Sequence, residues 1–254
     1  MAEPRKPTQL VVFDFDWSLV DQDTDRYLFE VLDPDLRMRL ELQKDTVQWT
    51  DNVAECLRLL HQSGVGKDQI IKAFSTLPLH PAMKRAIETL HKDQSKIETS
   101  FLILSNSNSE FIEIVLNHHK VDLKIFKQII TNPAQFNQDG MLVLNRRIPY
   151  DFPIQHSCIH GCSPNMCKGE ELKNFLNSST IHFDRIVYVG DGSNDFCPIT
   201  QFKSMDCALI RRNMGLAKKV TEDGDRLIKC QKFYWSDAWE LEIIFRNTLC
   251  KPPN

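Results

Sequence analysis

The chain has 254 residues, 42% of them hydrophobic, and a formal net charge of −3 at pH 7. This length and apolar content are typical of one domain with an inserted or appended subdomain, and the weak negative charge argues against a nucleic-acid partner. No apolar run approaches the roughly 20 residues that a membrane span requires. The first seven residues are charged and contain prolines instead of the apolar core of a signal peptide. We therefore expect a cytoplasmic protein without a membrane partner and with eight reduced cysteines, while the oligomeric state stays open.

The first predicted strand covers residues 10–13 and ends in two carboxylates. Its apolar and β-branched residues lack a helical period, which is typical of a strand buried on both faces. Asp14 and Asp16 follow at the carboxyl edge, where open α/β sheets hold their reactive groups. Two like charges so close are costly to bury unless a cation compensates them, and Mg²⁺ prefers oxygen ligands. These residues alone fit a magnesium site and a solvated strand end equally well.

Residues 22–96 have a largely helical pattern, and no strand of the main sheet is predicted there. Asp33-Pro34-Asp35 interrupts the helices once. A helix cap is predicted at residues 50–52, and a glycine-containing helix end at residues 63–66. We predict that this stretch is a helical cap inserted after the first strand, and that residues 1–21 and 97–254 form the catalytic core.

The remaining sequence alternates strands and helices. Strands are predicted at residues 100–104, 126–131, 184–189 and 207–210, and helices after residue 109, at 169–176 and at 236–249. Residues 137–140 are predicted to form a hairpin turn. This alternation predicts an α/β fold with a doubly wound parallel sheet.

Polar clusters end three of the predicted strands. They are Asp14 with Asp16, Ser105 with Asn106, and Asp191 with Asn194 and Asp195. A fourth element, Lys168, begins a helix between the last two clusters. In this order the residues resemble the four motifs of the haloacid-dehalogenase superfamily of phosphatases, with Ser18 where threonine is usual. The resemblance covers nearly the whole chain.

The resemblance implies a magnesium-dependent phosphatase. Asp14 would be the nucleophile that becomes an aspartyl-phosphate, and Asp16 would act as general acid and then as general base. Mg²⁺ would be held by Asp14, the backbone carbonyl of Asp16 and Asp191. Asp195 would support the metal shell or the lysine of the third motif.

The same resemblance assigns the phosphate contacts. Ser105 and Lys168 would hold the phosphoryl oxygens by hydrogen bond and charge. A phosphotransferase or a pyrophosphatase could use this site in another way. A non-catalytic phosphate-binding protein is disfavoured, because binding alone needs no Asp16.

One branch of this superfamily is resembled more closely in the sequences of residues 13–16, 24–25, 162–169 and 191–198. This branch is the phosphocholine/phosphoethanolamine phosphatase family, whose plant members include pyrophosphatases and thiamine-phosphate-phosphatase-like proteins. Its members carry a helical cap between the first two motifs. They act on small soluble phosphates, so the implied partner is a small phosphorylated metabolite.

Three residues bear on the head group of that substrate. In the amino-alcohol branch, acidic residues at the positions of Asp25 and Asn106 are implied to hold a cationic head. The neutral Asn106 weakens such binding, because a charge-assisted contact is worth about 1.5–3 kcal/mol. Trp17 could receive a cationic or aromatic ring, with packing against the cap as the alternative. These departures favour thiamine monophosphate, with phosphocholine, phosphoethanolamine and pyrophosphate as alternatives.

A stretch rich in cysteine precedes the third motif. Cys158, His160, Cys162 and Cys167 lie within ten residues and could bind Zn²⁺ as soft ligands. Their spacing matches no familiar zinc finger, and the family carries similar residues beside its third motif. Structural zinc and reduced buried thiols both stay open, with reduced thiols favoured.

Overall fold

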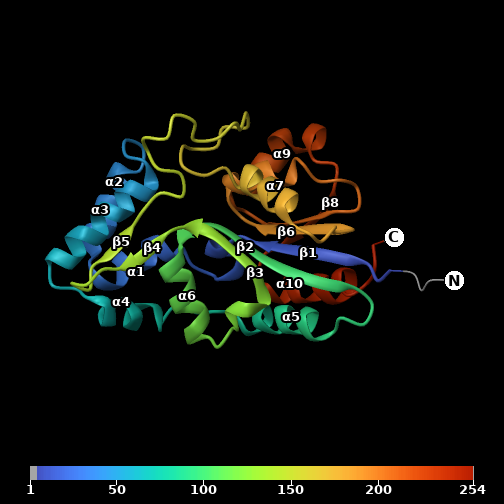
Figure 1. Cartoon of the computed structure of the whole chain (residues 1–254), viewed down its shortest axis with the longest axis horizontal. Helices are drawn as coiled ribbons and strands as arrows, with labels where there is room; N and C mark the ends of the chain where they lie inside the picture. The colour runs from blue at the N-terminus through green and yellow to red at the C-terminus, as the bar shows by residue number, and fades with distance from the viewer. Residues whose placement is uncertain (1–4, 254) are drawn as a thin grey trace.

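The structure is a computed structural model that describes residues 5–253. Residues 1–4 and 254, which the predicted core includes, lie outside the described residues. Its centre is a six-stranded parallel sheet with the order β3-β2-β1-β6-β7-β8 (Figure 1). The strands are β1 (Thr8–Phe13), β2 (Glu98–Asn108), β3 (Phe126–Asn132), β6 (Arg185–Gly190), β7 (Cys207–Arg211) and β8 (Gln231–Trp235). The predicted doubly wound α/β fold is confirmed.

Helices cover both faces of this sheet, as the continuous apolar run at residues 10–13 of β1 requires. Val11 and Phe13 join the apolar cluster beneath α5 (Pro81–Lys92), α6 (Ser109–His118) and α10 (Ala238–Ile244), which is extended by the η4 turn (Phe245–Leu249). Leu10 and Val12 join the cluster beneath α7 (Lys168–Ser178), α8 (Phe196–Ile199) and α9 (Gly215–Leu227). Because successive strand residues point to opposite faces, one short strand contributes to two cores. Figure 1 shows α7 and α9 on one side of the sheet and α5, α6 and α10 on the other.

Five helices connect β1 to β2, and no strand of the main sheet interrupts them within the described chain. They are α1 (Thr24–Leu32), α2 (Pro34–Gln43), α3 (Trp49–Gln62), α4 (Lys67–Phe74) and α5. The first four lie at one end of the molecule with the hairpin of β4 (Ala134–Phe136) and β5 (Leu142–Leu144) (Figure 1). In contrast, α5 packs against α10, where Arg85 Nη2 lies 2.8 Å from Glu242 Oε2. The division of the chain into cap and core at residues 22–96 stays a prediction.

The cap of α3 differs from the predicted one. The helix begins at Trp49, and the side chain of Gln48 accepts a hydrogen bond of 3.1 Å from the backbone N–H of Asp51. Residues 50–52 therefore lie inside the helix. Asn52 is buried there and donates to the carbonyl of Leu40 at 3.1 Å, so its side chain serves a contact between helices and caps nothing.

The elements that were not predicted include α9 and β8. Both lie toward the C-terminal end of the chain, and β8 forms the edge of the sheet. Within residues 5–253, every helix is too short or too polar to cross a lipid bilayer.

Candidate active site

Three strand ends meet at the carboxyl edge of the sheet. Phe13, the last residue of β1, is in register with Ile103 of β2 and with Val189 of β6. The backbone N–H of Asp14 then donates to the carbonyl of Val189 at 2.9 Å. The segments that follow β1 and β6 are thereby held side by side, as expected for neighbouring parallel strands.

Lys168 lies at the centre of this edge. Its Nζ is 2.7 Å from Asp14 Oδ2 and 2.8 Å from Asp195 Oδ1, and its side chain is 1% exposed. It begins α7, whose N-cap is Cys167. Burial would lower the pKa of Lys168, but attraction to the two carboxylates outweighs burial and raises it above the ordinary value. The lysine is therefore a fixed cation at the predicted phosphate position.

Asp195 makes hydrogen bonds through both of its oxygens. Oδ1 accepts from Lys168 and from the hydroxyl of Tyr188 at 2.7 Å. Oδ2 accepts from the backbone N–H groups of Asp191 and Gly192, at 3.0 and 2.9 Å. This approach requires a glycine at position 190, because a Cβ there would lie 2.6 Å from Asp195 Oδ2. Asp195 thus joins the loop after β6 to the buried lysine.

The carboxylates of Asp14, Asp191 and Asp195 form one group. All three are buried, and one oxygen of each lies within 4.8 Å of the others. Burial, with the charge of Asp195, raises the pKa of Asp14 to about 7, and burial, with the charge of Asp14, raises that of Asp191 to about 8. Ser18 donates to Asp191 Oδ1 at 3.0 Å, so it has a hydrogen-bonding role at the position where threonine is usual. These hard oxygen donors fit a Mg²⁺ ion.

Asp16 points toward the N-terminus of α1. Its Oδ1 accepts a hydrogen bond of 3.0 Å from the backbone N–H of Thr24. Burial and the charges of Asp23, Asp25 and Asp14 raise the pKa of Asp16 well above its ordinary value. A carboxyl group with a raised pKa can carry a proton near neutral pH, as a general acid must.

The second motif lies beside the fourth. Ser105 is 1% exposed, and its Oγ accepts from the backbone N–H of Ser107 at 3.2 Å. Asn106 Oδ1 accepts from Asn194 Nδ2 at 2.8 Å. The neutral amide of Asn106 therefore links the end of β2 to the segment that follows β6.

Asp25 is buried near Asp16 and pairs with a residue that the sequence did not single out. Its Oδ2 accepts a hydrogen bond of 2.7 Å from Trp49 Nε1, whereas its Oδ1 is buried without a hydrogen-bond partner among the described residues. Burial and the charge of Asp23 raise the pKa of Asp25 to about 7. No local signal could have revealed Trp49, because it lies 24 positions away on another helix.

Trp17 has a charged neighbour from its own chain. The guanidinium carbon of Arg211 lies 5.6 Å from the Trp17 ring centroid, and Arg211 donates to the Trp17 carbonyl at 2.5 Å. Arg211 also pairs with Asp21 at 2.7 Å. The backbone of Trp17 has a φ of 54°, in the left-handed region. Arg211 thus contacts both the ring and the backbone of Trp17, and whether the ring contacts substrate or packs against the cap stays untested.

A parallel sheet whose carboxyl edge gathers aspartates and one buried lysine has the fold of the haloacid-dehalogenase class. Residues 9–249 match the model of the family described as Putative Phosphatase, and the chain belongs to this family. A pyridoxal phosphate phosphatase of Bos taurus, PHOSPHO2, is 34% identical over 220 residues, which cover 83% of this chain and 85% of the relative. A thiamine phosphate phosphatase-like protein of Arabidopsis thaliana is 30% identical over 239 residues, 92% of this chain and 93% of the relative.

The fold comparison agrees with the family. A haloacid-dehalogenase-family hydrolase from Salmonella enterica superposes with a TM-score of 0.63 at 13% identity, over 94% of this chain and 72% of that one. At this identity the match shows the fold alone. The family and the named relatives make the protein an enzyme, a phosphoric monoester hydrolase, and the predicted resemblance to this superfamily is confirmed.

Proposed function

We propose that the enzyme hydrolyses a small phosphomonoester through a phosphorylated Asp14, with Mg²⁺ as its cofactor. The observation that carries the proposal is the buried Lys168, held between Asp14 and Asp195 beside the carboxylate of Asp191. Asp14, the carbonyl of Asp16 and Asp191 would hold the metal, which when bound would neutralise and orient the phosphate. The four hydrogen bonds that Asp195 accepts leave it a supporting role.

The chemistry of the protein groups is a double displacement at phosphorus. The carboxylate of Asp14 attacks phosphorus, the bond to the leaving oxygen breaks, and Asp16 gives that oxygen its proton. Asp16 then takes a proton from the attacking water, and the bond between Asp14 and phosphorus breaks to release inorganic phosphate. Lys168 and the hydroxyl hydrogen of Ser105 would stabilise the equatorial phosphoryl oxygens.

For the head group we propose a ring-bearing substrate with a cationic or N–H donor group, such as thiamine monophosphate. The support is Asp25, which presents a buried oxygen without a partner in the described part of the chain, near Asp16. An unpaired buried acceptor is costly, and a donor on the substrate would satisfy it. The relatives named for pyridoxal phosphate and thiamine phosphate both point to ring-bearing phosphates. In this proposal α1 to α4 and the β4–β5 hairpin form the cap, which supplies Asp25 and Trp49.

Phosphate release from a panel of substrates tests both levels of the proposal. The panel contains thiamine monophosphate, pyridoxal phosphate, phosphocholine, phosphoethanolamine and pyrophosphate, each with Mg²⁺. Asp14→Asn should abolish turnover of every substrate, whereas Asp139→Asn in the exposed turn after β4 should change nothing. Asp25→Asn should lower kcat/KM for the ring-bearing substrates more than for pyrophosphate.

Other outcomes of these assays would contradict separate parts of the proposed function. Near wild-type turnover by Asp14→Asn would refute the covalent mechanism. Efficient turnover of phosphocholine or pyrophosphate, with none of the ring-bearing esters, would refute the substrate proposal and leave the phosphatase mechanism in place. Phosphate transfer to an added alcohol instead of water would identify a phosphotransferase.

A further inference from the structure

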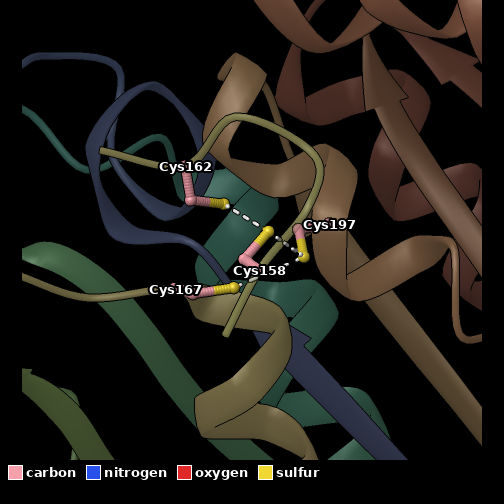
Figure 2. A group of neighbouring side chains, drawn as sticks. All are labelled: Cys158, Cys162, Cys167 and Cys197. Carbon is pink, nitrogen blue, oxygen red and sulfur yellow. Dashed lines mark hydrogen bonds between the residues drawn. The ribbon is translucent and has the colours of Figure 1, made fainter. Parts of the chain in front are cut away.

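Four cysteine sulfurs converge behind the active site. Cys158 and Cys162 come from the loop before α7, Cys167 is the N-cap of α7, and Cys197 lies in α8. Figure 2 shows the four side chains directed at one another. The Sγ atom of Cys158 lies 3.4 Å from that of Cys162 and 3.3 Å from that of Cys197, and the Sγ atoms of Cys167 and Cys197 are 3.4 Å apart. All four sulfurs lie within 4.8 Å of one another.

These distances fit a shared metal and no disulfide. A disulfide bond requires sulfurs about 2.05 Å apart. Around a tetrahedral Zn²⁺ with Zn–S bonds of about 2.3 Å, the sulfurs lie about 3.8 Å from one another. The three separations of 3.3–3.4 Å are well beyond the first value and slightly below the second, and all pairs of sulfurs lie within 4.8 Å. We infer that Cys158, Cys162, Cys167 and Cys197 bind one structural Zn²⁺ as a four-cysteine site.

The backbone around the sulfurs is arranged for this role. The N–H of His160 donates to Cys158 Sγ at 3.3 Å, which is the kind of outer contact that stabilises a thiolate ligand. Gly161 has a φ of 81°, a conformation that turns the loop back toward the cluster. At Gly169, a Cβ would lie 2.6 Å from Cys197 Sγ, so only glycine admits this sulfur beside α7.

The charge near the cysteine cluster and the identity of its ligands are also consistent with a bound Zn²⁺. Four thiolates around Zn²⁺ carry a net negative charge, and Lys219 donates to the carbonyl of His160 at 3.1 Å, which places a cation beside the loop. His160, which the sequence offered as a ligand, packs its ring against Phe196 with the centroids 6.2 Å apart. Cys197 takes its place from a segment 30 residues beyond Cys167. With Cys197 as the fourth ligand instead of His160, the cluster offers the four cysteine ligands that a tetrahedral Zn²⁺ site requires.

The site would hold the catalytic edge together. Cys167 directly precedes Lys168, and Cys197 follows Asp195 by two residues. A metal bound by both cysteines therefore fixes the two segments that carry the buried ion pair of Lys168 and Asp195. With four protein ligands the metal has no open position for water or substrate, so its role is structural. This inference does not depend on which substrate the enzyme hydrolyses.

Metal content of the purified enzyme tests the inference. Protein without a histidine tag is produced with zinc in the medium, exchanged into buffer with EDTA, and measured for zinc by mass spectrometry. We expect one zinc per chain that survives EDTA and is released by an organomercurial that blocks thiols. Cys158→Ser and Cys197→Ser should each lose it, whereas Cys230→Ser, at a buried cysteine outside the cluster, should keep it.

Two further measurements keep the inference falsifiable. Asp191→Asn should retain full zinc, because the metal belongs to sulfur and not to the acidic group. Cobalt-substituted wild-type enzyme should show the sulfur-to-metal charge-transfer absorption of a tetrahedral thiolate site, which needs no variant that folds. Wild-type protein with zinc well below one per chain, a disulfide within the cluster, or zinc retained in both cysteine variants would overturn the inference.

Discussion

Replacing Lys168 with methionine should destabilise the fold and nearly abolish activity. The change keeps most of the apolar stem and removes a charge that lies 2.7 Å from Asp14 and 2.8 Å from Asp195. The two carboxylate side chains are 8% and 0% exposed, so water cannot replace the lost ammonium. Breaking a buried ion pair by removing one partner costs about 3–5 kcal/mol. For a chain of this size that corresponds to a fall in Tm of roughly 10 °C.

The loss should depend on pH, with a sign set by Asp14. The pKa of Asp14 is raised to about 7 in the folded protein, so the folded state takes up a proton there that the unfolded chain does not hold. A protonated Asp14 no longer needs the ammonium. The cost of Lys168→Met should therefore be smaller near pH 5 than near pH 8, on either side of about 7. Because the lysine also faces the predicted phosphoryl position, kcat should fall by about 10²–10³.

Thermal and urea unfolding in EDTA, at both pH values, measure these effects without a metal at the acidic group. Lys173→Met, at an exposed position of the same helix, is the matched control and should leave Tm unchanged. In the double variant Lys168→Met/Asp14→Asn the losses should be less than additive, because the two residues share one interaction. A Tm for Lys168→Met equal to the wild-type value at both pH values would refute the reasoning.

Three other changes test separate parts of the molecule. Asp16→Asn should turn over p-nitrophenyl phosphate slowly and accumulate phosphate on the Asp14 peptide, which mass spectrometry of quenched samples would detect; an unmodified peptide at saturating substrate would count against the intermediate. EDTA should silence the enzyme reversibly, with activity restored by Mg²⁺, and full activity after exhaustive chelation would contradict the cofactor. Glu242→Gln should lower the free energy of unfolding near neutral pH by about 1 kcal/mol, because Glu242 pairs with Arg85 and Arg246. Those arginines lower the pKa of Glu242, so its contribution to the free energy of unfolding is present above the ordinary glutamate pKa and is lost as pH falls. If urea unfolding showed the same loss of stability in Glu242→Gln at every pH, the ion-pair explanation would be refuted.

The sequence predicted which side chains meet at the carboxyl edge of the sheet, because the signals for them are local. Asp14, Ser105 and Asp191 each follow a continuous apolar run, and the rule that parallel strands end at one edge brings the three together. The structure places the strand ends in register there and adds Lys168 from the start of α7. What local sequence could not show is the charge state of the group, since burial and neighbouring carboxylates raise the pKa values of Asp14 and Asp191.

The contacts that sequence reasoning missed join distant positions. Trp49 donates to Asp25 across 24 positions, Arg211 reaches the carbonyl of Trp17 across 194, and Cys197 meets Cys158 across 39. No periodicity or spacing rule encodes such pairs, because each depends on how whole elements pack. The cysteine-rich cluster that the sequence indicated therefore included His160 and lacked Cys197, whose sulfur lies beside that of Cys158.

The missed elements α9 and β8 have only weak signals in the sequence. In α9 the buried apolar residues are few and are separated by charged ones, and a glycine lies near each end. Propensity therefore argues against a helix, and packing of Leu216 and Val220 on the sheet overrides it. The edge strand β8 buries only Trp235 fully, so it lacks the continuous apolar run that marks the central strands.

The electrostatics of the candidate active site also support the proposed divalent cation. Asp14, Asp191 and Asp195 are all buried, and Lys168 is the one cation that pairs with them among the described residues. With all three ionised, the lysine leaves a net charge of minus two in a dry environment, which is costly. The raised pKa values of Asp14 and Asp191 mean that these carboxylates take up protons more readily, which removes that charge. A protonated Asp14, however, could not act as the proposed nucleophile. A bound divalent cation would cancel this charge and keep Asp14 ionised, so the binding of the metal would at the same time activate the proposed nucleophile.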